Sequence, residues 1–73
     1  MKIRLYVPAG VCMACNATKR RLDQRGIDYE VLQAADYPEE VDRLATLAGR
    51  NAPLVVTPDQ VWAGFRPGKI DQF

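Results

Sequence analysis

Two cysteines, Cys12 and Cys15, stand three positions apart in the segment GVCMACNATKR at residues 10–20. They are the only cysteines among the 73 residues, and the sequence contains no histidine. A structural zinc site needs four Cys or His ligands, and a Cys–His nucleophile needs a histidine. A disulfide that closes so short a loop would stabilise little. The favoured interpretation is therefore a working redox pair, and the alternatives are a metal cluster shared by two chains or an inert or structural pair.

The cysteine pair falls at the start of an expected helix. From about Cys12 to Arg25 there is no helix breaker, and Gly26 stands where a C-cap belongs. A free thiol with a pKa near 8.5 is only about 3% ionised at pH 7, whereas helix N-termini lower this pKa to roughly 3.5–7.5. Cys15 lies one turn further along and is more shielded. We therefore expect Cys12 to attack a disulfide and Cys15 to resolve the adduct.

The flanking patterns predict the elements that position this helix. Ile3, Leu5 and Val7 alternate with polar or exposed positions, which predicts a strand that Pro8 and Gly10 end. IDYEVL at 27–32 predicts a second strand, and PLVV at 53–56 and VWAGF at 61–65 predict two short strands around the turn TPDQ. A second helix is expected between them, with a capping box of Asp36 and Glu39, an apolar face of Val41, Leu44, Ala45 and Ala48, and an end at Gly49. Pro67 can start a last short helix with Ile70 and Phe73 on one side.

The resulting order, β-α-β-α-β-β-α, predicts one α/β domain over residues 1–73. The first half is a βαβ unit with parallel strands, and the second half is an antiparallel hairpin. The minimal arrangement is a four-stranded mixed sheet flanked by three helices. A C-x-x-C beside a βαβ pattern is typical of a thioredoxin-like redox motif.

Pro53 opens a strand that this topology makes central, an unfavourable place for a residue without an N–H. A cis Ala52–Pro53 bond would turn the chain and leave the Ala52 backbone free to pair with a substrate. The alternative is a trans proline that merely starts the strand. Trp62 and Phe65, on either side of Gly64, are expected either in the core or on an apolar surface that contacts a partner. The basic run from Lys19 to Arg21 is expected to be a solvated face or a docking site for an acidic partner.

Composition excludes several classes of function. Hydrophobic residues make up 48% and charged residues 26%, and the net charge is +1. This balance gives no strong electrostatic case for nucleic-acid or membrane partners. The start MKIRLYV is neither a signal peptide nor a membrane span. We expect a cytoplasmic monomer without metal or cofactor.

CMAC followed by ATKR, RGIDYE, APLVV and WAGFRP resembles the NrdH-redoxins, glutaredoxin-like redoxins that serve ribonucleotide reductase. The resemblance implies a thioredoxin fold, Cys12 as the attacking and Cys15 as the resolving cysteine, and Pro53 as a cis-proline. It also implies a disulfide of ribonucleotide reductase, most closely class Ib, as the client, and thioredoxin reductase as the electron source. The partner-contact residues expected around the cysteines are Met13, Ala14, Ala52, Pro53, Trp62, Gly64, Phe65 and Arg66.

The sequence also departs from that family. Met13-Ala14 replaces the usual Val-Gln or Met-Gln, and the loop PAGV has no Lys or Arg and is one residue longer. One alternative is a glutathione-dependent glutaredoxin, although such proteins carry Thr-Val-Pro and a Gly-Gly with an acidic pair where this chain has Asn51-Ala52-Pro53 and Gly64-Phe65-Arg66-Pro67. A second alternative is a redox-silent adaptor, against which the reactive dithiol argues.

Overall fold

The computed structural model describes residues 2–73, and its elements follow the predicted order. The four strands are β1 (Ile3–Val7), β2 (Tyr29–Gln33), β3 (Leu54–Val56) and β4 (Val61–Ala63). The helices are α1 (Met13–Gln24), α2 (Pro38–Ala48) and α3 (Pro67–Asp71), with a short 3₁₀ turn, η1 (Ala34–Asp36), before α2.

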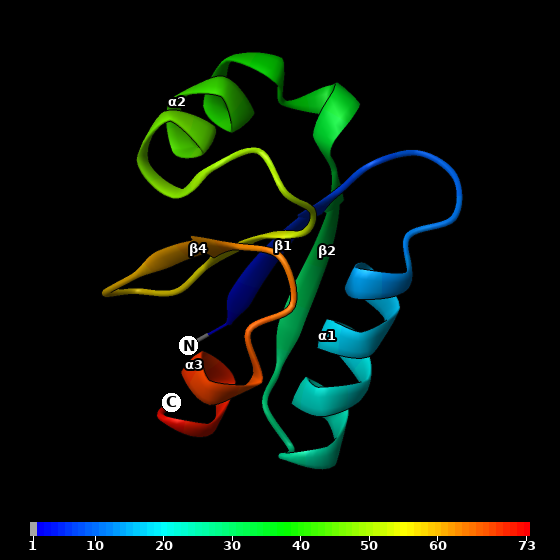
Figure 1. Ribbon diagram of the computed structural model, residues 1–73, viewed down its shortest axis with the longest axis vertical. Helices are drawn as coiled ribbons and strands as arrows, with labels where there is room; N and C mark the ends of the chain where they lie inside the picture. The colour runs from blue at the N-terminus through cyan, green and yellow to red at the C-terminus, as the bar shows by residue number, and fades with distance from the viewer. Residues whose placement is uncertain (1) are drawn as a thin grey trace.

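The strands form one mixed sheet in the order β2-β1-β3-β4 (Figure 1). Leu5 of β1 is parallel to Val31 of β2 and antiparallel to Val55 of β3, which in turn pairs with Trp62 of β4. The parallel first pair, the antiparallel hairpin and the central place of β3 confirm the predicted thioredoxin fold.

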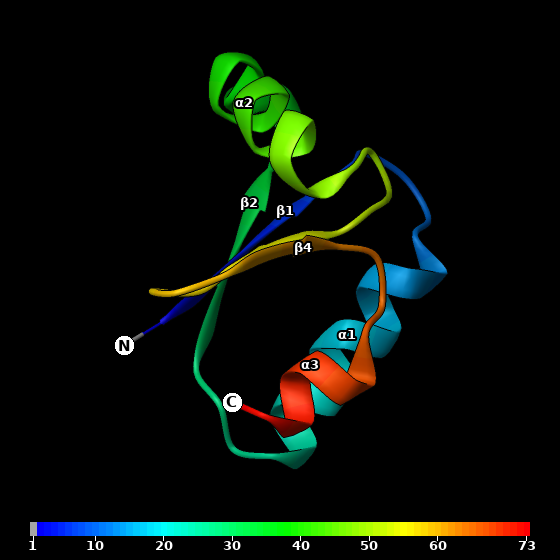
Figure 2. The same cartoon turned by 60° about the vertical axis from the view of Figure 1, so that its left-hand side comes forward.

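Helices cover both faces of the sheet, with α1 and α3 on one face and α2 on the other (Figure 2). The alternating side chains of β1 contribute to the apolar core on each face of the sheet. Ile3, Leu5 and Val7 join the core under α1 and α3, and Tyr6 joins the core under α2. The α1 side of the sheet therefore presents a continuous apolar layer directly beneath the cysteine helix.

The ends of α1 follow from its sequence. Cys12 is the N-cap residue in an extended conformation. At the other end Gly26 has φ +66°, and the N–H groups of Gly26 and Ile27 donate to the carbonyls of Asp23 and Leu22 at 3.1 and 3.0 Å. These two bonds form a Schellman motif, which needs the left-handed conformation that glycine adopts at no steric cost.

Two local predictions are wrong. Asp36 and Glu39 do not form a capping box, because Pro38 occupies the first helical position and makes Tyr37 the N-cap residue, without a side-chain cap. Phe73 lies beyond the end of α3 and is 49% exposed, so only Ile70 anchors this helix in the core.

An ion-pair cluster holds α3 against α1. Arg21 donates from Nε and Nη2 to the two carboxylate oxygens of Asp71, at 3.0 and 2.6 Å, and Arg25 Nη1 lies 3.6 Å from Asp71 Oδ1. Hydrogen bonding from Arg21 is the main cause that lowers the pKa of Asp71. The cluster fixes the short C-terminal helix beside the cysteine helix, although 50 residues separate Arg21 from Asp71.

Within residues 2–73, the helices are too short or too polar for any of them to cross a bilayer.

Candidate active site

Cys12 and Cys15 form a disulfide at the N-terminus of α1, with 5.2 Å between their Cα atoms. The backbone N–H of Cys15 donates to Cys12 Sγ at 3.1 Å, and the N–H of Asn16 donates to the Cys12 carbonyl at 3.1 Å. The first turn of α1 contains no acidic residue. When the disulfide is reduced, the same N–H and the positive end of the helix can stabilise a thiolate on Cys12.

The two sulfur-bearing side chains differ in exposure. Cys12 is half-buried, whereas Cys15 is 3% exposed and belongs to the core cluster with Leu22, Trp62 and Ile70. An incoming disulfide therefore reaches Cys12 more easily than Cys15. This asymmetry agrees with the predicted division of roles.

The Ala52–Pro53 peptide bond is cis, as predicted. Pro53 is buried, and its carbonyl accepts a hydrogen bond from the N–H of Gly64 at 2.8 Å. Leu54, the next residue, pairs with Tyr6 near the end of β1 and with Ala63 at the end of β4. Pro53 therefore lies at the end of the sheet where the chain leaves β1 toward Cys12. Half-buried Ala52 packs against the same core cluster as Cys12.

Trp62 is a core residue. Its side chain is 3% exposed and packs in the cluster that contains Cys15, so it offers no surface to a partner. Its Nε1–H has no hydrogen-bond partner among residues 2–73. Of the two alternatives expected for Trp62, the structure supports the core, because β4 directs this side chain into the layer under α1 and α3.

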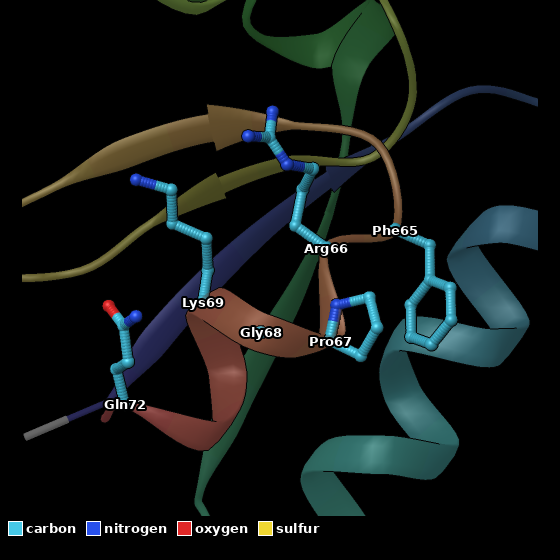
Figure 3. Close-up of a pocket in the computed structure, with 6 residues that line it drawn as sticks. All are labelled: Phe65, Arg66, Pro67, Gly68, Lys69 and Gln72. Atoms are coloured by element: carbon cyan, nitrogen blue, oxygen red, sulfur yellow. The ribbon is translucent and has the colours of Figure 1, made fainter.

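The residues after Trp62 do reach the surface. Gly64 has φ +84° and turns the chain out of β4. Phe65 is 40% exposed and Arg66 is exposed. Figure 3 shows Phe65 at the start of α3 on the side toward α1, with Arg66 extending toward the strands.

Phe65 and Arg66 border a shallow pocket of about 470 Å³ beside α3 (Figure 3). Two of its lining side chains are cationic and none is acidic. The lining consists of Phe65, Arg66, Pro67, Gly68, Lys69 and Gln72.

Large apolar side chains stand out beside the disulfide. Val11 is 92% exposed and Met13 is 81% exposed, on either side of Cys12, while half-buried Ala14 follows them in α1. Met13 was predicted from its place between the cysteines. Val11 was missed, because an apolar residue in a loop gives no sequence signal that distinguishes exposure from burial.

Two further residues, one beside the cysteines and one at the opposite end of α1, were not among the predicted site residues. Lys19 lines a hollow together with both cysteines, and Asp71 holds α3 in place. The i, i+4 spacing of Cys15 and Lys19 could have indicated the first, whereas nothing local in the sequence pairs Asp71 with Arg21. Among residues 2–73, no group of three or more His, Cys, Asp or Glu side chains is arranged to hold a metal ion.

A helix-capping C-x-x-C disulfide, a cis-proline at the adjacent strand and the β2-β1-β3-β4 sheet define a thioredoxin-fold dithiol–disulfide oxidoreductase.

Comparisons with known proteins agree with this class. The glutaredoxin family model matches residues 4–62. The chain is 36% identical to the glutaredoxin-like protein NrdH of Escherichia coli K12 over 72 residues, which cover 99% of this chain and 88% of that protein. It is 29% identical to NrdH of Lactococcus lactis IL1403 over 59 residues, covering 81% and 82%. The chain therefore belongs to the glutaredoxin family and, within it, to the glutaredoxin-like NrdH proteins.

Solved structures give the same result. The NrdH-redoxin of Escherichia coli superposes with a TM-score of 0.85 at 36% identity, covering 100% of this chain and 95% of that one. Glutaredoxin grx-1 of Archaeoglobus fulgidus superposes with a TM-score of 0.74 over 97% of this chain and 83% of that one. Its identity is 21%, so this second match supports the fold alone.

Proposed function

We propose that this redoxin reduces the disulfide of a class Ib ribonucleotide reductase and is itself re-reduced by thioredoxin reductase. The observation that carries the choice of reductant is the pocket beside α3, which has two cations and no carboxylate among its lining residues. The similarity to the Escherichia coli NrdH-redoxin, which is described as having a thioredoxin-like activity profile, points the same way.

The reaction transfers two electrons from the dithiol to the client. The Cys12 thiolate attacks one sulfur of the client disulfide, forms a mixed disulfide and releases the first client thiolate. Cys15 then loses its proton and attacks Cys12 Sγ, which forms the Cys12–Cys15 bond and releases the second client thiolate. The two protons lost by the redoxin thiols are balanced by two taken up by the client thiolates from water.

The exposed surface around Cys12 suits a protein partner. Val11, Met13 and Phe65 present apolar side chains near the disulfide, and such surfaces are typical of protein–protein contacts. The cis Ala52–Pro53 bond lies at the same end of the sheet as the cysteines, where half-buried Ala52 packs against the core cluster that Cys12 also contacts. We propose that Met13, Ala14, Ala52, Pro53, Gly64, Phe65 and Arg66 contact the partner.

Glutathione requires a different surface. Its γ-glutamyl ammonium group needs an acidic partner, and neither Arg66 nor Lys69 can serve. The loss of one charged contact costs roughly 1.5–3 kcal/mol, which corresponds to about tenfold to a hundredfold in affinity.

The test is NADPH consumption at a fixed concentration of the oxidised redoxin. One arm contains thioredoxin reductase, and the other contains glutathione with glutathione reductase. We expect the first arm to be at least tenfold faster, and the Cys12→Ser variant to be inactive in both. A faster glutathione arm would assign the protein to the glutathione-dependent glutaredoxins.

The client is tested separately by turnover of a class Ib ribonucleotide reductase with no small-molecule dithiol present. We expect deoxyribonucleotide formation to depend on the wild-type redoxin and to be absent with Cys12→Ser. Rapid reduction by thioredoxin reductase without support of this reductase would keep the electron source and refute the client.

A further inference from the structure

A second hollow lies directly beside the redox pair. It has a volume of about 280 Å³ and is formed by the loop after β1, the first turns of α1 and the edge strand β2. The polar and sulfur-containing residues that line it are Cys12, Cys15, Asn16, Lys19 and Gln33. Lys19 is the single charged residue of this lining, since the remaining residues are apolar.

Lys19 is placed to act on Cys15. The two residues are four positions apart on α1, so their side chains are neighbours on one face of the helix. Lys19 is half-buried and makes no ion pair or side-chain hydrogen bond with any residue in the described range 2–73. Its ammonium group is therefore not neutralised by a carboxylate of this part of the chain.

The other charges near this region face elsewhere. Arg4 of β1 pairs with Glu40 of α2 across the opposite face of the sheet, and Glu30 of β2 is level with Arg4 on that face. Asp23, one turn beyond Lys19, lies near Tyr29, whose pKa is raised first by burial and then by this carboxylate.

The charges of α3 are also accounted for. Asp71 pairs with Arg21 and Arg25. Arg66 lines the 470 Å³ pocket beside α3, and Lys69 Nζ lies 3.4 Å from Gln60 Oε1. Along α1, Arg20 is exposed and is absent from the lining of the hollow. Lys19 is thus the one charged residue that lines this hollow together with both cysteines.

Cys15 is the thiol that needs such a charge. At 3% exposure within an apolar cluster, its ionised form is disfavoured by desolvation, yet only a thiolate can attack the mixed disulfide. Cys12 Sγ already accepts a hydrogen bond from the backbone N–H of Cys15 at the helix N-terminus. Within the described residues 2–73, no side-chain or backbone donor makes a hydrogen bond to Cys15 Sγ.

We propose that Lys19 supplies the positive charge that stabilises the Cys15 thiolate during resolution of the mixed disulfide. The Cys15 proton leaves to water, Cys15 Sγ bonds to Cys12 Sγ, and the bond between Cys12 and the client sulfur breaks to release the client thiolate. The inference rests on the dithiol chemistry of the site and not on which client or reductase is used.

The test follows a single turnover with one equivalent of 2,2′-dipyridyl disulfide, a neutral reagent that releases one pyridinethione when Cys12 attacks and a second when Cys15 resolves. Both phases are recorded by stopped-flow absorbance between about pH 5 and 10. The variants are Lys19→Gln, Lys19→Arg and, as a control of equal charge change one residue away, Arg20→Gln.

In Lys19→Gln we expect the second phase to be about threefold to tenfold slower at pH 7, with its midpoint displaced about 0.5–1 pH unit upward. The variant and the wild type should converge at high pH, where the thiol is ionised without help. Lys19→Arg should restore the wild-type profile, and Arg20→Gln should leave it unchanged. A merely structural role would slow the reaction at every pH.

Three results would overturn the proposal. The second phase could be unchanged in Lys19→Gln, both phases could slow equally, or Arg20→Gln could reproduce the effect. None of these outcomes bears on the choice between thioredoxin reductase and glutathione, since the assay contains neither.

Discussion

Replacing Trp62 by Phe should affect stability and leave partner binding unchanged. The side chain is 3% exposed and packs beside Cys15, Leu22 and Ile70. Truncation of a buried Trp to Ala costs about 3–5 kcal/mol. A domain of 73 residues is stable by only about 4–11 kcal/mol at 0.05–0.15 kcal/mol per residue, so the alanine variant is a poor probe.

Trp62→Phe is the better perturbation because it keeps an aromatic ring and removes no hydrogen bond to residues 2–73. We expect a loss of about 1–2 kcal/mol from packing alone. For a domain of this size that corresponds to a decrease in Tm of about 5–15 °C. Thermal unfolding followed by circular dichroism measures it.

The matched variant is Phe65→Ala, three positions further along and 40% exposed. It should cost less than about 1 kcal/mol of stability but raise the KM for the protein reductase about threefold to tenfold, as loss of an interface aromatic does. Both KM values are measured well below either Tm. An increased KM for Trp62→Phe with an unchanged Tm would refute the assignment of Trp62 to the core.

The remaining predictions concern the thiols and the ion-pair cluster. Cys15→Ser should accumulate a mixed disulfide with its client, visible by mass spectrometry, and Cys12→Ser should form none; the reverse pattern would exchange the two roles. The Cys12 thiol should titrate below about 8.5 in a plot of alkylation rate against pH, and a midpoint at or above that value would remove the helix-terminus argument. The pKa of Asp71 is lowered, chiefly by the hydrogen bond from Arg21, so the cluster stabilises the fold above the unfolded pKa of about 3.9 and this contribution is lost as the pH falls through the folded pKa. Asp71→Asn should therefore reduce the Tm slightly at pH 7 and have no effect in strong acid, whereas a pH-independent difference would contradict the ion-pair explanation.

Much of the fold was predictable because local signals agreed with one another. The alternation of Ile3, Leu5 and Val7 gave the strand and its buried face, and Gly26 and Gly49 marked the two long helix ends. The cis bond before Pro53 followed from topology rather than from local preference. Where two local signals competed, as at Asp36 and Pro38, the fixed φ of proline decided the helix start.

The site was predictable as far as covalent chemistry and spacing reached. Cys12 and Cys15 needed only their spacing and the helix that follows them. Burial did not follow from residue type, since Trp62 and Phe65 are both aromatic and lie three positions apart, yet one is in the core and the other at the surface. The pairing of Asp71 with Arg21 depends on how two helices meet in space, which no local pattern encodes.

The central place of β1 has a consequence for the order in which the protein can assemble. β1 is the first strand made, but its two neighbours come later, with Val31 and Val55 as the partners of Leu5. Closing the second pairing brings together residues 50 positions apart, which is entropically costly and slow compared with local contacts. Until β3 arrives, β1 presents an unpaired apolar edge, so a nascent or truncated chain that ends before residue 54 exposes a template for aggregation.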